Sequence, residues 1–328
     1  MPDSKPVGSV ATIDGSFLLS VGGAQQFYWI RPGETDPDPL SFASGERTPD
    51  AIVSIAVVSD EVWLIGKSGT EVWQTTGDQN APYIRISGRV YSDGCADPAT
   101  VCTTSYNGLP CLLWVTNKKG VMIAQGSPQR ISTKSVESQL SGTTNIRAWA
   151  FRWNLHDFYA VTHDNGTLVY DLTTQTWSTW DTYGLPVWAA HLGIQVDEQI
   201  YAGDISQGII WKLEDGYLDE PDLPIVRELS GFIGIADNGY PCDSVNVRMN
   251  VGWPPSYTAT PLLELRWSDD YGFSWSPYFQ APLGRKGQYE YDVTFRSLGM
   301  MQRPGREFEF RFSDKAKFRI DYATLNEA

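Results

Sequence analysis

The stretch that decides the fold is Glu61-Val-Trp-Leu-Ile-Gly-Lys-Ser-Gly-Thr-Glu-Val-Trp73. The apolar run 62–65 predicts a strand, the polar run 66–69 a turn, and residues 71–73 a return strand. The sequence therefore predicts an antiparallel hairpin, with Trp63 on its first strand and Gly69 opening its second.

The same hairpin pattern recurs along the first two thirds of the chain. Each time, an aromatic residue in an apolar run is followed six or seven positions later by a glycine that opens the next run. The pairs are Phe17 with Gly23, Trp63 with Gly69, Trp114 with Gly120, Tyr159 with Gly166, and Tyr201 with Gly208. Successive aromatics lie 46, 51, 45 and 42 residues apart. Asn165-Gly166 is the signal for a tight two-residue turn.

A period of about 40 to 50 residues built from short antiparallel strands is typical of β-propeller blades. A further apolar run precedes most of the hairpins, at 52–58, 146–153 and 187–192, so each unit offers three or four strands. We expect about five such units. The repeated core is expected to consist of Trp63, Gly69, Trp114, Gly120, Tyr159, Gly166, Tyr201 and Gly208. An irregular β-sandwich with evenly spaced strands is the alternative. Residues 132–140 begin with hydroxyl side chains suited to capping, which predicts one short helix.

The C-terminal third has a different pattern. Residues 216–224 are acidic and contain two prolines, which is typical of a linker. We therefore expect a propeller-like repeat region at 1–215, a linker at 216–224 and an antiparallel β domain at 225–328. Runs such as 262–267 and 306–312 alternate apolar with polar residues, which favours half-buried strands. A small sandwich and a modified last section of the propeller both fit. The expected fold class is all-β.

Composition and charge narrow the choice of partners. The 328 residues include 30 glycines and 13% aromatics but only 5 methionines, which favours a turn-rich β protein. The formal net charge of -14 repels nucleic acid, so tight DNA binding is not expected. No apolar run reaches the roughly 18 residues of a membrane span, and the N-terminus has no signal-peptide pattern. We expect a soluble chain made in the cytosol.

The sharpest local motif is Ser268-Asp-Asp-Tyr-Gly-Phe-Ser-Trp275, which fits the S-x-D-x-G-x-[ST]-W pattern of an Asp-box hairpin. In this motif Asp270 accepts hydrogen bonds from the turn backbone, Gly272 supplies the permissive dihedral, and Trp275 packs underneath. Asp-boxes are common in sialidases, which also use an arginine triad, a tyrosine nucleophile and an acid. A single box, without their N-terminal arginine signature, favours a folding device over a catalytic site.

No other pattern indicates chemistry. The histidines His156, His163 and His191 are scattered, and the four cysteines have no metal-ligand spacing. We expect these residues to occupy strands, turns and the core. The sequence therefore predicts a protein without catalytic, cofactor-binding or metal-binding residues.

A series of short motifs carries a family resemblance. In chain order they are residues 61–66, 70–73, Gly94-Cys95-Ala96, 130–133 with Val136-Glu137, Tyr170-Asp171 with Trp177, Gly203-Asp204, and 265–275 with Leu283-Gly284. Together, over nearly the whole chain, they resemble the packaged-DNA stabilisation proteins of short-tailed (podovirus-type) phages. These are the tail-hub or nozzle components mounted below the portal.

The resemblance implies a structural virion protein of the phage tail that assembles as a hexameric ring. Its implied partners are copies of itself, the portal and adaptor proteins, and tailspike or tail needle proteins. It closes the portal-tail channel, and DNA passes through the lumen without sequence-specific binding. The implied location is the virion, and the host cytoplasm during assembly. Family members carry further residues upstream, so five units are expected to be a minimum for the complete propeller.

Two alternatives from other classes stay open. A glycan-hydrolysing, sialidase-like propeller predicts carboxylates and arginines that converge in one central pocket. A glycan-binding tail module predicts exposed tryptophans in a groove. The hub interpretation predicts ring formation through large subunit contacts and no enzymatic activity.

Overall fold

The chain is described by a computed structural model over residues 1–47, 50–214, 219–220, 223–236, 239–252, 260–284, 288 and 290–326. Antiparallel strands dominate, which confirms the predicted all-β class. The chain divides into two compact units, Met1–Glu214 (unit 1) and Asp215–Ala328 (unit 2).

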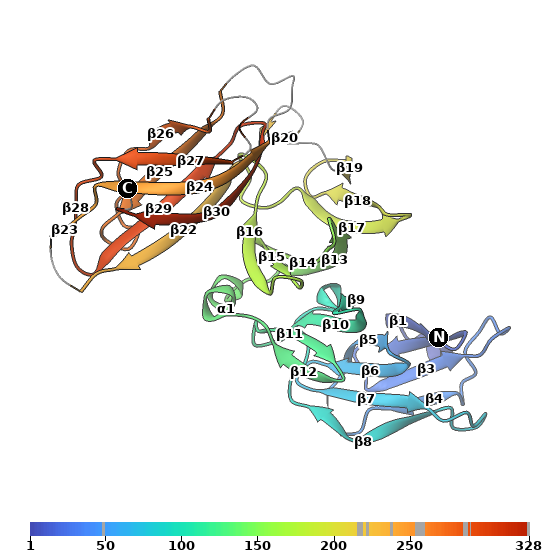
Figure 1. Cartoon of the computed structure of the whole chain (residues 1–328). Coiled ribbons are helices and arrows are strands. Elements are labelled where there is room, and N and C mark those ends of the chain that lie inside the picture. The colour runs from blue at the N-terminus through green and yellow to red at the C-terminus, as the bar shows by residue number, and fades with distance from the viewer. Residues whose placement is uncertain are drawn as a thin grey trace. The chain divides into compact units, whose positions relative to one another are not determined.

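Unit 1 consists of five antiparallel sheets that follow one another along the chain, here called blades 1 to 5 (Figure 1). Blades 1 to 4 have four strands each, and blade 5 has three. The strands are β1 (Val7–Ile13), β2 (Ser16–Val21), β3 (Gln26–Ile30) and β4 (Phe42–Ser44) in blade 1; β5 (Ile52–Val58), β6 (Glu61–Gly66), β7 (Thr70–Thr75) and β8 (Tyr83–Tyr91) in blade 2; β9 (Cys102–Tyr106), β10 (Leu109–Val115), β11 (Val121–Gln125) and β12 (Ser127–Arg130) in blade 3; β13 (Arg147–Trp153), β14 (His156–His163), β15 (Gly166–Asp171) and β16 (Thr176–Trp180) in blade 4; and β17 (Ala190–Val196), β18 (Gln199–Asp204) and β19 (Ile210–Leu213) in blade 5.

The predicted hairpins are the second and third strands of each blade. In blade 2, for example, Trp63 on β6 lies opposite Val72 on β7. In blade 4, Tyr159 on β14 lies opposite Tyr170 on β15. The predicted short helix is α1 (Lys134–Leu140), which begins after Thr133 because the Thr133 hydroxyl accepts a hydrogen bond from the Val136 N–H. Short 3-10 turns lie at η1 (Pro2–Ser4) and η2 (Pro98–Thr100).

Neighbouring blades pack face to face through four apolar clusters. Each cluster takes side chains from two consecutive blades, so the sheets of blades 2, 3 and 4 are buried on both faces. Representative pairs are Leu18 with Val62, Trp63 with Trp114, Leu113 with Tyr159, and Trp149 with Ile200. Among the described residues, no such cluster joins blade 5 to blade 1.

Unit 2 is a sandwich of two antiparallel sheets with its own core. One sheet has the order β22-β29-β25-β26 and the other β27-β24-β30, and two two-residue pairs, β20-β21 and β23-β28, lie outside them. The strands are β20 (Asp219–Glu220), β21 (Leu223–Pro224), β22 (Arg227–Gly234), β23 (Tyr240–Pro241), β24 (Ser244–Gly252), β25 (Leu262–Ser268), β26 (Phe279–Pro282), β27 (Glu290–Arg296), β28 (Met300–Met301), β29 (Gly305–Phe312) and β30 (Lys317–Leu325). Of the predicted linker 216–224, only β20 and β21 lie within the described residues.

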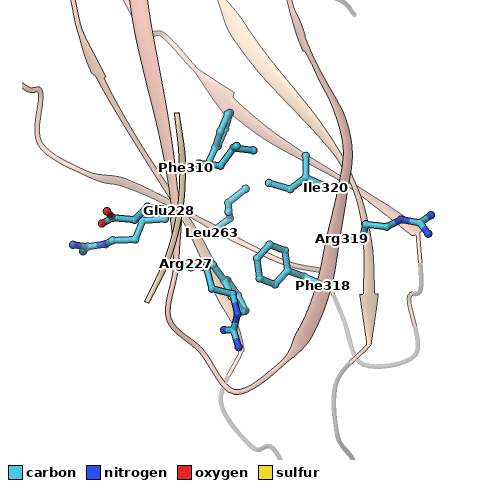
Figure 2. A pocket seen from close by; sticks show the side chains of 10 residues that line it. Arg227, Glu228, Leu263, Phe310, Phe318, Arg319 and Ile320 are labelled. Atoms are coloured by element: carbon cyan, nitrogen blue, oxygen red, sulfur yellow. The ribbon is translucent and has the colours of Figure 1, made fainter. Parts of the chain in front are cut away.

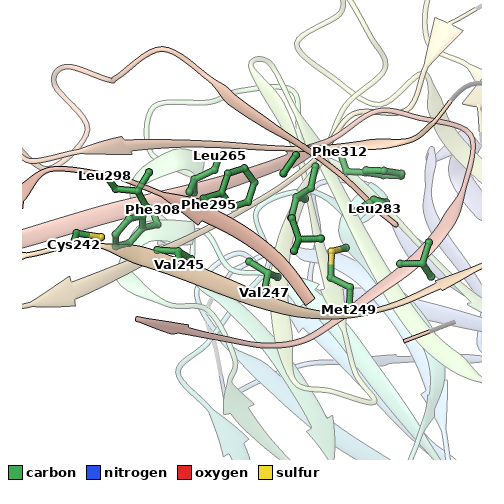
Figure 3. Close-up of a cluster of buried hydrophobic side chains, with 14 of the residues drawn as sticks. Cys242, Val245, Val247, Met249, Leu265, Leu283, Phe295, Leu298, Phe308 and Phe312 are labelled. Atoms are coloured by element: carbon green, nitrogen blue, oxygen red, sulfur yellow. The ribbon is translucent and has the colours of Figure 1, made fainter. Parts of the chain in front are cut away.

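The sandwich core joins both sheets of unit 2. Figure 3 shows Val245, Val247 and Met249 of β24 pointing toward side chains from the facing sheet, such as Leu265 and Phe308. Because this cluster is complete within unit 2, the C-terminal strands form a separate sandwich and not a last blade of the repeat region.

Candidate functional site

The faces of the blades carry most of the apolar surface of unit 1. We call the face of a blade that is turned toward the next blade in the sequence its forward face, and the opposite one its backward face. On the second strands, Leu18, Trp63, Leu113 and Ala160 lie on forward faces, whereas Leu64, Trp114, Tyr159 and Ile200 lie on backward faces. Side chains alternate between the two faces along a strand, so a shift of one residue moves a side chain to the other face.

The predicted core aromatics occupy the second strands, but not all of them are buried. Trp63, Trp114 and Tyr159 are fully enclosed between blades. Tyr201 was predicted as a fourth core aromatic and is 37% exposed, so this prediction is wrong. The reason is the alternation of side chains along β18. Ile200 and Ala202 pack against blade 4, so Tyr201, which lies between them in the sequence, points to the opposite face. This is the forward face of blade 5, and no further described blade covers it.

The predicted glycines all lie at the hairpin connections, where their roles differ. The Gly69 carbonyl accepts the Gly66 N–H at 2.7 Å, and the Gly120 carbonyl accepts the Thr116 N–H at the same distance. A Cβ at Gly166 would lie 3.2 Å from His163 Nε2, so a side chain there is crowded. A Cβ at Gly208 would meet no atom within 4 Å, so packing does not require glycine at that turn.

Side-chain hydrogen bonds also tie the blades together. The Tyr159 hydroxyl of blade 4 donates to the Thr100 carbonyl at 2.6 Å. The Trp177 indole of blade 4 donates to the Ile131 carbonyl, which follows blade 3, at 2.9 Å. These two hydrogen bonds join neighbouring blades and do not line a shared pocket.

The Asp-box turn uses its own polar groups. The Asp270 carboxylate accepts the Ser268 hydroxyl at 2.8 Å and the Ser274 N–H at 2.8 Å, and the hydrogen bonds from Ser274 hold the pKa of Asp270 below its usual value. The Gly272 N–H donates to Ser268 Oγ at 2.8 Å, and Gly272 has a φ of +84°. The Trp275 indole donates to the Gly272 carbonyl at 3.1 Å. These contacts close the turn, and both oxygens of the Asp270 carboxylate accept hydrogen bonds within it.

The histidines and Cys111 of unit 1 lie in strands or beside them and do not converge on one site. His156 Nδ1 lies 2.7 Å from Asp171 Oδ2 on the neighbouring strand, whereas His163 and His191 lie elsewhere, and burial lowers the pKa of both. Burial raises the pKa of the Cys111 thiol to about 12, far from the range of a nucleophile. Within the described ranges, no group of three or more His, Cys, Asp or Glu side chains is arranged to hold a metal ion.

The described residues line at least two hollows. A cavity of about 260 Å³ lies in unit 2, where Figure 2 shows Phe318 and Ile320 of β30 turned toward Leu263 and Phe310 while Arg319 points away. A larger hollow of about 620 Å³ lies in unit 1 over strands of blades 1 and 2, and its polar and aromatic lining is Phe42, Ser44, Glu46, Arg47, Glu71, Trp73, Tyr83 and Arg85. Over the described part of the chain, no helix has the length and apolar character that crossing a membrane requires.

Five consecutive antiparallel sheets, packed face to face at a period of 40 to 50 residues, define unit 1 as a β-propeller-type repeat protein. The family described as "Bacteriophage P22 Gp10, beta-propeller" matches residues 1–217. The chain therefore belongs to this phage structural family, which confirms the resemblance seen in the sequence.

Other comparisons are more distant. The WD40 domain of SCAP from fission yeast is 9% identical, with a TM-score of 0.36 over 94% of this chain and 85% of that one. PorZ, a surface component of the type-IX secretion system of Porphyromonas gingivalis, is 8% identical, with a TM-score of 0.24 over 87% of this chain and 47% of that one. No curated protein sequence matches the chain significantly.

Proposed function

We propose that the protein is a hub or nozzle component of a phage tail, which assembles as a hexameric ring, closes the portal-tail channel and so stabilises packaged DNA. The observation that carries the proposal is the membership of residues 1–217 in the P22 Gp10 β-propeller family. In this proposal the protein acts without catalysis, in the virion, after assembly in the host cytoplasm.

The blade packing supports a load-bearing role. Close-packed interiors have low compressibility and transmit strain, and each interface between consecutive blades is filled by apolar side chains. A tail component below a pressurised head needs this stiffness more than it needs a pocket. Portal and adaptor proteins above, and tailspike or tail needle proteins around or below, are the proposed neighbours.

Charge supports passage of DNA without binding. A net charge of -14 disfavours contacts with phosphates, so retention in this proposal comes from closure of the channel and not from affinity. The first strands of the five blades contain no Asp or Glu, and their only formal charges are Arg147 and Arg152. The proposal further includes acidic side chains along the channel wall, and these side chains then come from other strands, from loops or from unit 2.

Electron microscopy tests the proposal directly. Purified protein is imaged alone and after mixing with portal and adaptor rings, with a matched sample of portal and adaptor alone. The expected result is an added ring at the tail end of the adaptor. A protein that leaves the portal-adaptor particles unchanged contradicts the proposal.

A second candidate, glycan binding, is favoured by one observation. The 620 Å³ hollow of unit 1 combines carboxylates, guanidinium groups and the ring of Phe42, which is 41% exposed, and such a mixture can bind sugars through hydrogen bonds and stacking. Titration calorimetry with sialyllactose and with a bacterial surface polysaccharide tests it. Binding that is lost in Arg85→Ala supports this candidate, and an absence of heat with both sugars contradicts it.

A further inference from the structure

Strand β22 (Arg227–Gly234) is one edge of the four-stranded sheet of unit 2. It pairs with β29 along all eight residues without a register shift, and no strand within the described residues pairs with its other side. In an antiparallel pair, alternate residues direct their N–H and C=O groups away from the partner strand. The free edge of β22 therefore offers a row of backbone donors and acceptors to which an extended chain can add.

The other edge strands of unit 2 have features that oppose such an addition. β26 has four residues and ends in a proline, and three of the seven residues of β27 are charged. β30 has a register shift beside Asp321 and carries further charges at Lys317 and Arg319. Short length, proline, charge and irregular register all discourage edge pairing. Residues 229–234 of β22 contain neither proline nor charge, so its edge is the least protected of the four edges of the two main sheets.

The core-side face of β22 borders the hollow of about 260 Å³. Leu229 lies opposite Phe310 on this face, lines the hollow and is 56% exposed. No described residue of β22 belongs to the buried core, and the edge strand of the facing sheet, β30, turns Phe318 and Ile320 toward the hollow (Figure 2). Side chains alternate between the two faces of a sheet, so a strand added to β22 would place every second side chain over this hollow. An apolar side chain of the added strand could therefore fill it.

Arg227 lies at the same hollow without an acidic partner. Its guanidinium donates to the Ile225 carbonyl at 3.4 Å, and within the described part of the chain no carboxylate lies at ion-pair distance from it. The other three arginines of this sheet each pair with a carboxylate: Arg266, Arg306 and Arg311. Burial lowers the pKa of Arg227, because the charged form loses solvation. A half-buried guanidinium without an ion pair favours a ligand that brings a carboxylate.

We propose that an extended segment of a partner protein adds to the free edge of β22, with an apolar side chain in the hollow and a carboxylate two residues along that pairs with Arg227. Backbone hydrogen bonds supply affinity in this mode of recognition, and pockets for alternate side chains supply specificity. The spacing of two residues follows from the strand, because Leu229 and Arg227 lie on the same face. β22 lies outside the residues 1–217 that match the phage family, so the proposal is independent of the hub function.

The first test measures binding of a synthetic strand to the full chain by fluorescence anisotropy. The probe is the amidated, fluorescein-labelled peptide Thr-Val-Thr-Val-Thr-Leu-Thr-Glu-Thr, whose leucine and glutamate match Leu229 and Arg227 when it runs antiparallel to β22. Two control peptides carry lysine in place of the glutamate, or N-methyl groups on two adjacent central residues, which remove backbone donors. The first peptide is expected to bind at least about tenfold more tightly than either control. Equal binding of all three, or no binding of the first at about 1 mM, overturns the proposal.

Charge reversal at Arg227 tests the ion pair. Arg227→Glu is expected to reverse the preference and bind the lysine peptide more tightly than the glutamate peptide. Arg319→Glu is the matched control, because Arg319 is 71% exposed and points away from the hollow (Figure 2), and it should bind both peptides as the wild type does. Arg227→Gln should lose the preference, and it keeps the test decisive if circular dichroism shows that the reversed variant is not folded. An unchanged preference in both Arg227 variants overturns the proposed ion pair.

Hydrogen exchange locates the contact. Exchange of the full chain is followed by mass spectrometry with and without the glutamate peptide. Addition to β22 is expected to slow exchange within residues 227–234 and to leave β26 and β27 unchanged. Slowing elsewhere in the chain, with none in residues 227–234, overturns the proposal.

Discussion

Truncation of Trp114 is expected to be among the most destabilising changes in unit 1. The side chain is 0% exposed and packs between blades 2 and 3, with its ring centroid 6.4 Å from that of Trp63. Its indole Nε1 has no hydrogen-bond partner within the described structure, so the loss on truncation is one of packing and transfer. Trp→Ala substitutions at such sites cost about 3–5 kcal/mol, the transfer free energy of the ring plus the cavity that remains.

The matched control is Tyr201→Ala, on the equivalent strand of blade 5. Because Tyr201 is 37% exposed and lies on an uncovered face, its truncation is expected to cost about 1 kcal/mol in the monomer. Urea unfolding, followed by fluorescence at low protein concentration, measures both free energies of unfolding. With an m value of about 2–3 kcal/mol/M, the urea midpoint of the Trp114 variant falls by about 1–2.5 M. Equal losses for the two variants would refute the assignment of interior and end faces.

Four further predictions follow from individual contacts. Tyr159→Phe removes the hydroxyl that donates to the buried Thr100 carbonyl and should lower the free energy of unfolding by about 1–3 kcal/mol in urea titrations. Arg306→Met should cost unit 2 about 1–3 kcal/mol in the same assay, because buried Arg306 donates to the half-exposed Asp269 carboxylate at 2.7 and 2.8 Å and to two backbone carbonyls that would lose their donor. Stability should fall as pH rises above about 9 in thermal melts. Burial raises the pKa of the Cys111 thiol to about 12 in the folded chain, whereas the unfolded chain releases this proton near the ordinary thiol pKa of about 9. Asp270→Ala should lower the melting midpoint of unit 2 by a few degrees at neutral pH. Because the folded pKa of Asp270 is depressed, this difference should begin to shrink below about pH 4 and disappear once the pH has fallen through the lower folded pKa.

Refuting results are specific to each of the four. An unchanged midpoint for Tyr159→Phe would mean that the contact between blades adds nothing. A fully stable Arg306→Met would mean that hydrophobic packing replaces the ion pair. Stability that is flat to pH 11 would contradict burial of the thiols, and an acid-independent loss in Asp270→Ala would contradict the role of the charged carboxylate.

Strand pairing could be predicted from the sequence because turn chemistry is local. The Gly66–Gly69 segment lies at a hairpin turn, and α1 begins next to Thr133, a residue type suited to capping. The tight turn predicted at Asn165-Gly166 lies one residue earlier, at Asp164 and Asn165, because Gly166 already pairs with His163. These features need only a few neighbouring residues and no knowledge of what packs above the sheet.

The direction in which each aromatic points could not be predicted in this way. Trp63 lies on a forward face and Trp114 on a backward face, yet both are buried, because interior blades are covered on both sides. The sequences of these strands therefore do not alternate between apolar and polar residues, and such an alternation would have shown which face each side chain occupies. The face matters in blades 1 and 5, because Phe17 and Tyr201 lie on faces that no described blade covers. The signal that could have identified the face of the last repeat is the set of large apolar residues Ile194, Tyr201 and Ile210 at its outward positions.

The measurement that tests the central claim most directly is the retention of packaged DNA. DNA-filled heads that carry portal and adaptor, but lack this protein, are incubated with and without it, and nuclease-sensitive DNA is followed over time. If the protein closes the channel, the heads that receive it keep their DNA protected while the others release it. Equal leakage from the two samples, with the protein shown to be bound, would contradict the account.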